Sequence, residues 1–451
     1  MRRAWPIVTL CVMFLISVPF VTPYLRGDGL GYYAWMASPI TDGDLHFADE
    51  YSHGNEFVRR DVFNLDGSVR DAYKTKTGHL RNPWGAGAAI FWAPFFLVAQ
   101  GISALLGGDL EGFSTTHLWL VAFGSALYAF MGIVISYAVC RRFFGKPASF
   151  VAALAVWGAT SLPVYQYFLP FWPFAVGTFA SALLVWLWMR AGWQPLRWFV
   201  VGVLGGLLAS IHPVAVAWNL LPAASFVRRP PEAKGKQLKA ATAWIAGGVT
   251  GMIPQLIGKG IVYGSPLHTG YQDEVNFLQP RFLKVFFGSD HGLFLWTPLA
   301  ILAFVGLIVV ARKHDRTLGW GLLAVFAGMS WIVAGHHTPE LSSFGNRFFV
   351  LFTPGFLVGT AAIFEKLWAR RRAVVVALAA ALILWNALLA FQWAWGMTPK
   401  RSGTRWSVVL RNQFGPAERE LAVAMKLFFT DRAAFLERVN AADLEEADPL
   451  G

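Results

Sequence analysis

The chain has 451 residues, of which 56% are hydrophobic, 16% aromatic and only 14% charged. Soluble proteins carry about 25% charged residues, so this composition excludes an ordinary cytosolic enzyme and a disordered scaffold. The two cysteines are too few for a disulfide-rich secreted domain. The composition predicts an all-α polytopic membrane protein.

The formal net charge of +12 suggests a nucleic-acid partner at first sight, but its distribution argues against one. The basic residues gather in four short connections between apolar runs, which is typical of cytoplasmic loops in membrane proteins. The four clusters are Arg141, Arg142 and Lys146; Arg228, Arg229, Lys234, Lys236 and Lys239; Arg312, Lys313 and Arg316; and Lys366, Arg370, Arg371 and Arg372. We therefore predict membrane lipids, and no nucleic acid, as partners.

The apolar run Trp5 to Tyr24 follows two arginines and lacks a small-residue cleavage site, which predicts an uncleaved first span. The polar segment 26–82 comes next and holds nine of the 26 acidic residues. The apolar stretch 83–106 is long enough to cross, but all four basic clusters face the inside only if it does not. We interpret it as a juxtamembrane or re-entrant element.

The remaining apolar runs complete a predicted bundle of about 11 transmembrane helices, with the N-terminus inside. These runs are 117–139, 147–167, 170–190, 197–211, 212–228, 240–262, 292–311, 317–335, 347–367 and 373–394. The predicted organisation is a transmembrane domain, 1–394, whose first external loop is 26–116, and an external helical tail, 395–451. In the tail, Pro416 to Phe429 is amphipathic and Asp431 is a candidate cap of a further helix.

Two features predict local packing. The pairs Gly202/Gly206 and Gly247/Gly251 have the GxxxG spacing that permits close helix approach. His212-Pro213 marks a break between two short spans, and we expect His212 to be a buried, hydrogen-bonded residue there.

Candidate catalytic carboxylates follow the first span. Asp28 lies between two glycines at the outer membrane surface, where the backbone is free for close approach to a ligand. The rings of Tyr32 and Tyr33 are candidates for stacking on a sugar. Asp42 and Asp44 form an Asp-x-Asp pair, whose carboxylates are able to share a divalent cation. A solvated turn is the alternative for each acidic group, and a metal requirement stays open.

Candidate cations occupy other external segments, namely His79, Arg81, Arg281, His291 and Arg347. Arg347 stands at the outer end of a span, where it either snorkels to the lipid headgroups or contacts a phosphate, for which guanidinium geometry is well suited. The external group of His336, His337 and Glu340 is a further candidate for a metal site, although it does not have the spacing of a zincin helix.

Five short patterns resemble bacterial GT-C glycosyltransferases, which are related to protein O-mannosyltransferases and aminoarabinose transferases. They are Gly27 to Tyr33, Asn82 to Gly87, Tyr263 to Tyr271, His291 to Pro298 and Ser343 to Arg347. The resemblance implies a GT-C-like bundle with a long first external loop and a polyprenyl-phosphate sugar as donor. It also implies that Asp28 is the base or positions the acceptor, and it adds Tyr271 to the candidate substrate contacts.

The resulting hypothesis is a membrane glycosyltransferase that acts on the outer face of the bacterial inner membrane. Its acceptor, a glycan, lipid or protein, is left undefined by the sequence. One candidate base without a second nucleophile favours direct, inverting displacement. The alternatives are a transporter or flippase of lipid-linked sugars, which would need charged residues along a path through its spans, and a non-catalytic assembly protein on the same scaffold.

Overall fold

The computed structural model describes residues 4–227, 234–268, 270, 275–336, 344–399 and 403–444. Within these ranges the regular structure is helical, and the only strand-like pairings are isolated bridges, such as Phe63 with Val69. The prediction of an all-α protein is confirmed for this part of the chain.

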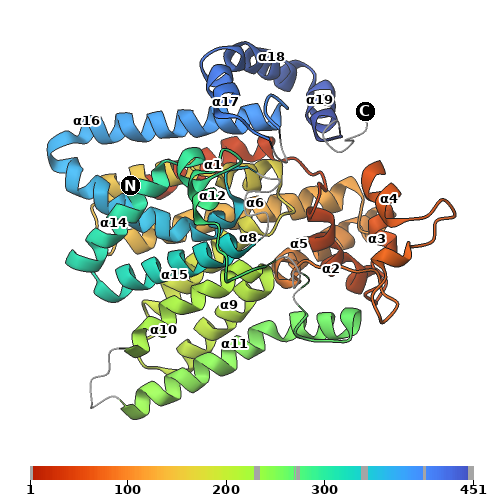
Figure 1. Ribbon diagram of the computed structural model, residues 1–451, viewed down its shortest axis with the longest axis horizontal. Helices are drawn as coiled ribbons and strands as arrows, with labels where there is room; N and C mark the ends of the chain where they lie inside the picture. The colour runs from red at the N-terminus through yellow and green to blue at the C-terminus, as the bar shows by residue number, and fades with distance from the viewer. Residues whose placement is uncertain are drawn as a thin grey trace.

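Nineteen α-helices and several short helical turns are described, and Figure 1 shows their arrangement. The α-helices are α1 Trp5–Ser17, α2 Gly29–Thr41, α3 Ala48–Ser52, α4 Glu56–Val62, α5 Gly87–Leu106, α6 Thr115–Cys140, α7 Lys146–Gly158, α8 Phe174–Trp188, α9 Pro195–Ile211, α10 Leu220–Val227, α11 Lys234–Tyr263, α12 Phe282–Phe287, α13 Leu293–Trp296, α14 Leu299–Lys313, α15 Arg316–Gly335, α16 Thr353–Ala394, α17 Trp406–Gln413, α18 Pro416–Thr430 and α19 Arg432–Leu444. The tighter or wider turns are η1 Val18–Phe20, η2 Asp71–Tyr73, η3 Val164–Phe168, η4 Pro213–Asn219 and η7 Arg347–Phe352.

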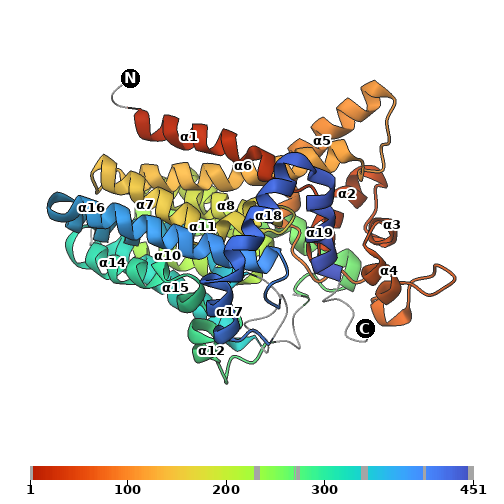
Figure 2. The ribbon, with the colours of Figure 1, turned by 90° about the horizontal axis from the view of Figure 1, so that it is seen from above.

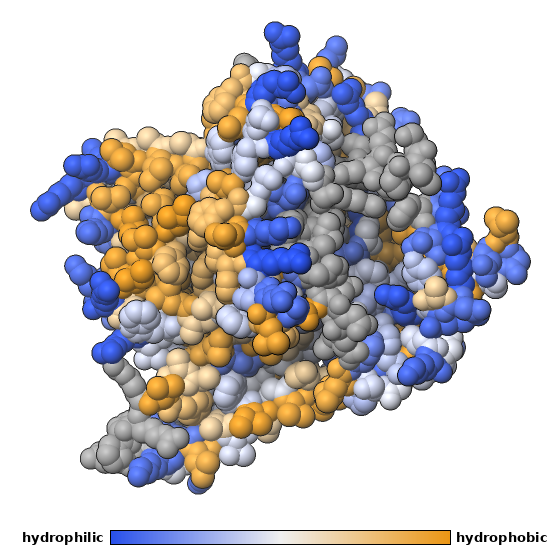
Figure 3. Space-filling model, viewed as in Figure 1, coloured by the Kyte–Doolittle hydropathy of each residue, from blue (hydrophilic) through white to orange (hydrophobic). Residues whose placement is uncertain are grey.

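Among the described residues, five helical segments are long and apolar enough to cross a membrane: α5, α6, α11, α15 and the run Arg347–Ala394. Shorter apolar helices accompany them, among them α8 and α9. Apolar side chains cover the left part of the surface in Figure 3, whereas hydrophilic residues gather at its far left edge and over the right-hand side. This distribution is the one expected of a membrane-embedded helical protein.

The two ends of the bundle differ in the segments that they carry. Helices α2 to α5 lie together at one end, whereas the α14–α15 connection and the bend within α16 lie at the other, in both Figure 1 and Figure 2. The α6–α7 connection lies beside this bend, because the backbone N–H of Gly145 donates to the carboxylate of Glu365 at 2.9 Å. Basic clusters that are far apart in sequence therefore share the end opposite the acidic loop.

Helices α9 and α11 pack with their backbones in direct contact at the predicted glycines. A Cβ atom at Gly202 would lie 2.1 Å from the Trp244 carbonyl oxygen, and one at Gly247 would lie 2.0 Å from that of Phe199. These distances are too short for any side chain, so the predicted close approach is confirmed and has its origin in the absent Cβ atoms.

The predicted break at His212 is confirmed. Helix α9 ends at Ile211, and His212 adopts an extended backbone with φ −157° and ψ 137°. Its Nδ1 accepts the backbone N–H of Val214 at 3.2 Å, and the side chain is buried. Because Pro213 has no N–H to continue the ladder, the chain restarts as the tighter turn η4.

The two runs predicted at 347–367 and 373–394 form the two halves of α16, and the chain reverses direction between them (Figure 1). Helix α16 bends at Arg371, whose φ of −143° and ψ of 41° are non-helical. The basic cluster from Lys366 to Arg372 therefore lies at the turn between two helices, as the sequence pattern predicted.

The tail packs against the bundle. The backbone N–H of Thr404 donates to Asp290, and Arg432 donates to the Pro19 carbonyl in η1, just after α1. The predicted amphipathic stretch is helix α18, and Asp431 caps α19 by accepting the N–H of Ala434 at 3.0 Å, as expected. Figure 2 shows the tail helices crossing in front of the bundle near α1 and α2.

Candidate functional site

Asp28 stands at the N-terminal end of α2, in the turn that follows the first apolar helix. Gly27 has a φ of +50°, a left-handed conformation that glycine adopts without strain. The Asp28 side chain does not cap α2. Its carboxylate is therefore directed to contacts outside its own helix.

The turn that presents Asp28 is fixed by its neighbour Arg26. The guanidinium of Arg26 donates to the Phe168 carbonyl at 2.9 Å and lies 4.2 Å from the centre of that ring. In return, the indole N–H of Trp172 donates to the Arg26 carbonyl at 3.0 Å. The segment around η3 thereby clamps the turn between α1 and α2.

Arg347 is presented by a second turn with positive φ, from a distant part of the chain. Gly345 and Asn346 both have positive φ, of +58° and +50°. Ser161 donates to the Gly345 carbonyl at 2.8 Å, and the N–H of Gly345 donates to Nδ1 of the buried His291 at 3.3 Å. These contacts set the direction in which the Arg347 side chain leaves the backbone.

The two presented side chains meet. A guanidinium nitrogen of Arg347 lies 3.7 Å from a carboxylate oxygen of Asp28, with side-chain exposures of 15% and 34%. Trp172 lies beneath the pair, its ring centre 4.8 Å from the guanidinium carbon. The carboxylate and guanidinium singled out from the sequence thus form one half-buried ion pair beside an aromatic face.

The segment 82–84, which belongs to the sequence pattern Asn82 to Gly87, is hydrogen-bonded to α2. Asn82 donates to the Gly31 carbonyl at 2.9 Å, and Trp35 donates to the Trp84 carbonyl at 3.0 Å. The ammonium of the fully buried Lys259 donates to the carbonyls of Asn82 and Pro83 at 2.7 and 3.0 Å. The pattern at Asn82 to Gly87 therefore has a structural role, which is to hold α2 against α11.

The predicted stacking residues Tyr32 and Tyr33 are both buried, at 2% and 0% exposure. Tyr32 packs near Trp84, while Tyr33 packs against Phe171 and its hydroxyl donates to the Gly112 carbonyl. Tyr33 exposes no surface on which a sugar could stack, so that predicted contact does not occur in this structure. Successive side chains of a helix point about 100° apart, but α2 is buried on every side from Gly29 to Ser38, which the sequence pattern does not reveal.

Asp42 and Asp44 do not join Asp28. They follow the last residue of α2, and thirteen helical residues at 1.5 Å each separate the two ends by about 20 Å. Asp42 accepts from Thr41 at 2.9 Å, and Asp44 accepts from Ser38 and from the N–H of His46, both at 3.0 Å. Their carboxylates stabilise the end of α2.

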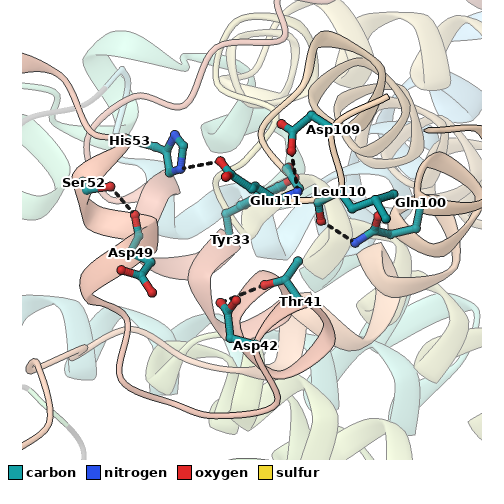
Figure 4. Close-up of polar contacts among 11 residues, drawn as sticks. Tyr33, Thr41, Asp42, Asp49, Ser52, His53, Gln100, Asp109, Leu110 and Glu111 are labelled. Carbon is teal, nitrogen blue, oxygen red and sulfur yellow. Dashed lines mark hydrogen bonds and ion pairs between the residues drawn. The ribbon is translucent and has the colours of Figure 1, made fainter. Parts of the chain in front are cut away.

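Figure 4 shows the surroundings of Asp42, where His53 pairs with Glu111 at 3.9 Å. In the part of the chain that the structure describes, no three His, Cys, Asp or Glu side chains gather as a metal ion would require. The arrangement therefore adds no support for the divalent cation that the Asp-x-Asp pair suggested.

Glu50, in α3, is a buried acid at this same end. Its exposure is 2%, and burial, followed by the charges of Asp42, Asp49 and Asp44, raises its pKa to about 8. The sequence carries no sign of this, since Glu50 is one of nine acids in a polar segment. Only the packing of α3 against α2 removes its carboxyl from water.

His79 and Arg81 belong to the hairpin that precedes α5. The His79 ring stacks on His46 at 4.5 Å, and burial, followed by the charge of His46, lowers its pKa. Arg81 lies 5.8 Å from the ring centre of Tyr73. His79 thus shares the Asp44 end of α2, away from Asp28.

The other predicted substrate contacts are dispersed. Arg281 precedes α12, and its N–H donates to the Ala334 carbonyl at 2.8 Å. His291 supports the turn before Arg347. Tyr271 lies outside the described residues, as do His337 and Glu340 of the candidate metal group.

Three residues of this region escaped the sequence interpretation: Trp172, Arg26 and Lys259. Lys259 offered a signal, because a lysine within an apolar span must find partners. Trp172 lies in a turn rich in aromatic residues, where the sequence does not distinguish the one that meets Arg347.

Comparison with protein-family models finds no match, and comparison with curated proteins finds none either.

Proposed function

We propose that this chain is a membrane glycosyltransferase of the GT-C type that takes its sugar from a polyprenyl-phosphate donor. The observation that carries the proposal is the ion pair between Asp28 and Arg347, at 3.7 Å and partly exposed. It joins a carboxylate and a guanidinium from segments far apart in the sequence, beside the ring of Trp172.

Arg347 is the group that would bind the donor phosphate. A planar guanidinium donates two parallel hydrogen bonds to phosphate oxygens, and its positive charge stabilises the phosphate as it leaves. In the resting protein Asp28 occupies this position. An entering phosphate displaces the carboxylate and frees it for the acceptor.

Asp28 is the group that would accept the proton. The acceptor hydroxyl attacks the anomeric carbon, the new C–O bond forms as the bond to the phosphate oxygen breaks, and the hydroxyl proton passes to Asp28. The carboxylate also stabilises positive charge that develops on the sugar ring. One displacement inverts the anomeric configuration.

The proposal includes the topology that such a donor requires. Eleven crossings, with segment 83–106 not crossing, put the basic clusters inside and Asp28 outside, at the level where an isoprenoid tail would enter from the bilayer. The bacterial inner membrane is the proposed location. The acceptor is a hydroxyl compound on the outer face.

The test is transfer of radiolabelled sugar from polyprenyl-phosphate donors by the full-length protein in membranes. We expect Asp28→Asn to lower kcat by roughly 100-fold or more, the range of general base catalysis. Arg347→Gln should raise the donor KM, by roughly 10- to 100-fold for a lost charged hydrogen bond.

The matched control is Asp66→Asn, which removes one acid from the exposed hairpin of the same external segment and should keep full activity. Full activity in the Asp28 variant would remove this residue from the mechanism. Movement of intact donor across vesicles without transfer would support a flippase and contradict the proposal.

A further inference from the structure

A basic hollow lies away from Asp28, at the end of the bundle that carries the basic clusters. It lies between the α6–α7 connection, the end of α8 and the start of α9, and encloses about 640 Å³. Its lining residues are Arg142, Leu187, Arg190, Leu196, Arg197 and Val200. Three guanidiniums from three separate segments thus face one space.

Backbone carbonyls at the end of α8 hold these guanidiniums in place. Arg190 donates to the Trp186 carbonyl at 3.0 Å and stacks on that ring at 3.8 Å. Arg197 donates to the Arg190 carbonyl at 2.7 Å, and Arg142 donates to that of Met189 at 3.4 Å. Each guanidinium has five N–H donors, so most remain for a ligand.

The charge of the hollow is not balanced by carboxylates. None of its lining residues is acidic, and no ion pair involves these three arginines within the described ranges. Such a concentration of guanidiniums favours an anion with several acceptor oxygens.

The remaining wall of the hollow is apolar. Leu196 and Val200 project from consecutive turns of α9 with exposures of 75% and 40%. A free inorganic anion would leave these side chains in water, whereas a lipid chain would cover them. The pairing of guanidiniums with an exposed apolar strip is the feature that separates a lipid from a soluble phosphate.

We propose that this hollow binds the phosphate headgroup of an anionic phospholipid, with an acyl chain along Leu196 and Val200. The site is independent of the proposed glycosyl transfer. It would anchor the α6–α7 and α8–α9 connections to the membrane surface.

The experiment uses the full-length protein in detergent, titrated with phosphatidylglycerol, phosphatidylcholine or inorganic phosphate. Thermal stability and lipid retention in native mass spectrometry are the readouts. We expect phosphatidylglycerol to bind and raise Tm, and the double variant Arg190→Gln/Arg197→Gln to weaken that binding at least tenfold. The matched control, Arg312→Gln/Arg316→Gln, removes the same charge from another connection at this end and should keep it.

Equal loss of phosphatidylglycerol binding in both double variants would show general charge attraction and overturn the proposal. An equal Tm increase with inorganic phosphate would identify a free-anion site and also overturn it. If the double variant fails to fold, Leu196→Asn is the second test, because it keeps all charges. Unchanged phosphatidylglycerol binding in that variant would contradict the acyl-chain contact.

Discussion

At the scale of single residues, the distance between Asp28 and Arg347 matters for their proposed roles. Charge-assisted hydrogen bonds are usually about 2.7–2.9 Å long, whereas this pair is 3.7 Å apart and partly open to solvent. Such partly exposed pairs contribute at most about 1 kcal/mol. An entering phosphate that offers Arg347 two acceptor oxygens therefore competes well against the Asp28 carboxylate.

Lys259, in contrast to the partly exposed Asp28–Arg347 pair, is a buried charge that its partners compensate. It is fully buried, and its ammonium donates to two carbonyls and faces the rings of Trp35 and Tyr263 at 5.3 and 4.9 Å. A buried charge is costly unless it is compensated in this way. Its partners are the carbonyls of Asn82 and Pro83, in the segment that is hydrogen-bonded to α2. Lys259 is therefore a positioning residue for the helix that follows Asp28.

Glu50 should make stability depend on pH. Its pKa is about 8 in the folded protein against an ordinary 4.5, so between these values the folded state holds a proton that the unfolded state has released. The contribution of Glu50 to stability is therefore fully present below about pH 4.5 and is lost as pH rises to about 8, by at most about 1.4 kcal/mol per pH unit. Thermal unfolding of the full chain from pH 5 to 9 measures this fall.

The variant Glu50→Gln isolates this effect because it keeps the shape without the charge. We expect it to match the native protein near pH 5 and to exceed its Tm at pH 8. Glu56→Gln, on the exposed face of α4, is the control and should leave the pH dependence unchanged. Parallel pH profiles for the native and Glu50→Gln proteins would contradict the burial argument.

At the scale of helices, two adjacent glycines of α11, Gly247 and Gly248, differ in how closely the backbone of α9 approaches them. A Cβ at Gly247 would lie 2.0 Å from the Phe199 carbonyl oxygen, whereas one at Gly248 would lie 3.8 Å from that of Gly202. We expect Gly247→Ala to destabilise the protein by about 1–3 kcal/mol, because the helices must separate to admit a methyl group. Thermal unfolding in lipid nanodiscs measures the difference.

Gly248→Ala is the matched control, one residue away in the same helix. Its methyl group meets only ordinary van der Waals distances, and alanine favours helix by about 1 kcal/mol over glycine. Neutral or slightly raised stability is the expected result. Similar destabilisation by both changes would contradict the argument that the close backbone contact at Gly247 causes the loss of stability.

At the scale of the whole molecule, membrane topology depends on whether α5 crosses. If it does not cross, the hairpin at Asp66 and the α14–α15 connection at Arg316 lie on opposite sides of the membrane. If it does cross, they lie on the same side. One comparison between these two positions therefore decides the topology.

The test replaces Cys11 and Cys140 with alanine and introduces Asp66→Cys or Arg316→Cys. A membrane-impermeant thiol reagent should label position 66 in intact cells and position 316 only after permeabilisation. Labelling of both positions in intact cells would mean that α5 spans, and would place the basic clusters outside.

Much of the architecture could be predicted from local patterns. The glycine pairs of α9 and α11, the break at His212 and the cap at Asp431 are found as expected, because each depends on neighbours within a few residues or on the size of one side chain. The turn at Arg371 is also found where the sequence predicted a break, because a basic cluster interrupts the apolar run there.

The candidate site was only partly predictable. Asp28 and Arg347 were singled out by chemistry, yet Asp42 and Asp44 carried the same chemical signal. Helix α2 places them about 20 Å from Asp28. Their closeness to Asp28 in the sequence does not predict this separation. Tyr33 was assigned to substrate for its ring, although its neighbours bury it.

The sequence by itself determined that this is a helical, membrane-type chain with an acidic loop and basic connections. Composition and hydrophobic runs reflect whether each segment is surrounded by lipid or by water. Only the tertiary structure decided which polar groups meet. Asp28 reaches Arg347 because two turns with positive φ, clamped by η3 and by His291, aim their side chains at one place. Such contacts between distant segments depend on the packing of the whole bundle, which no local pattern encodes.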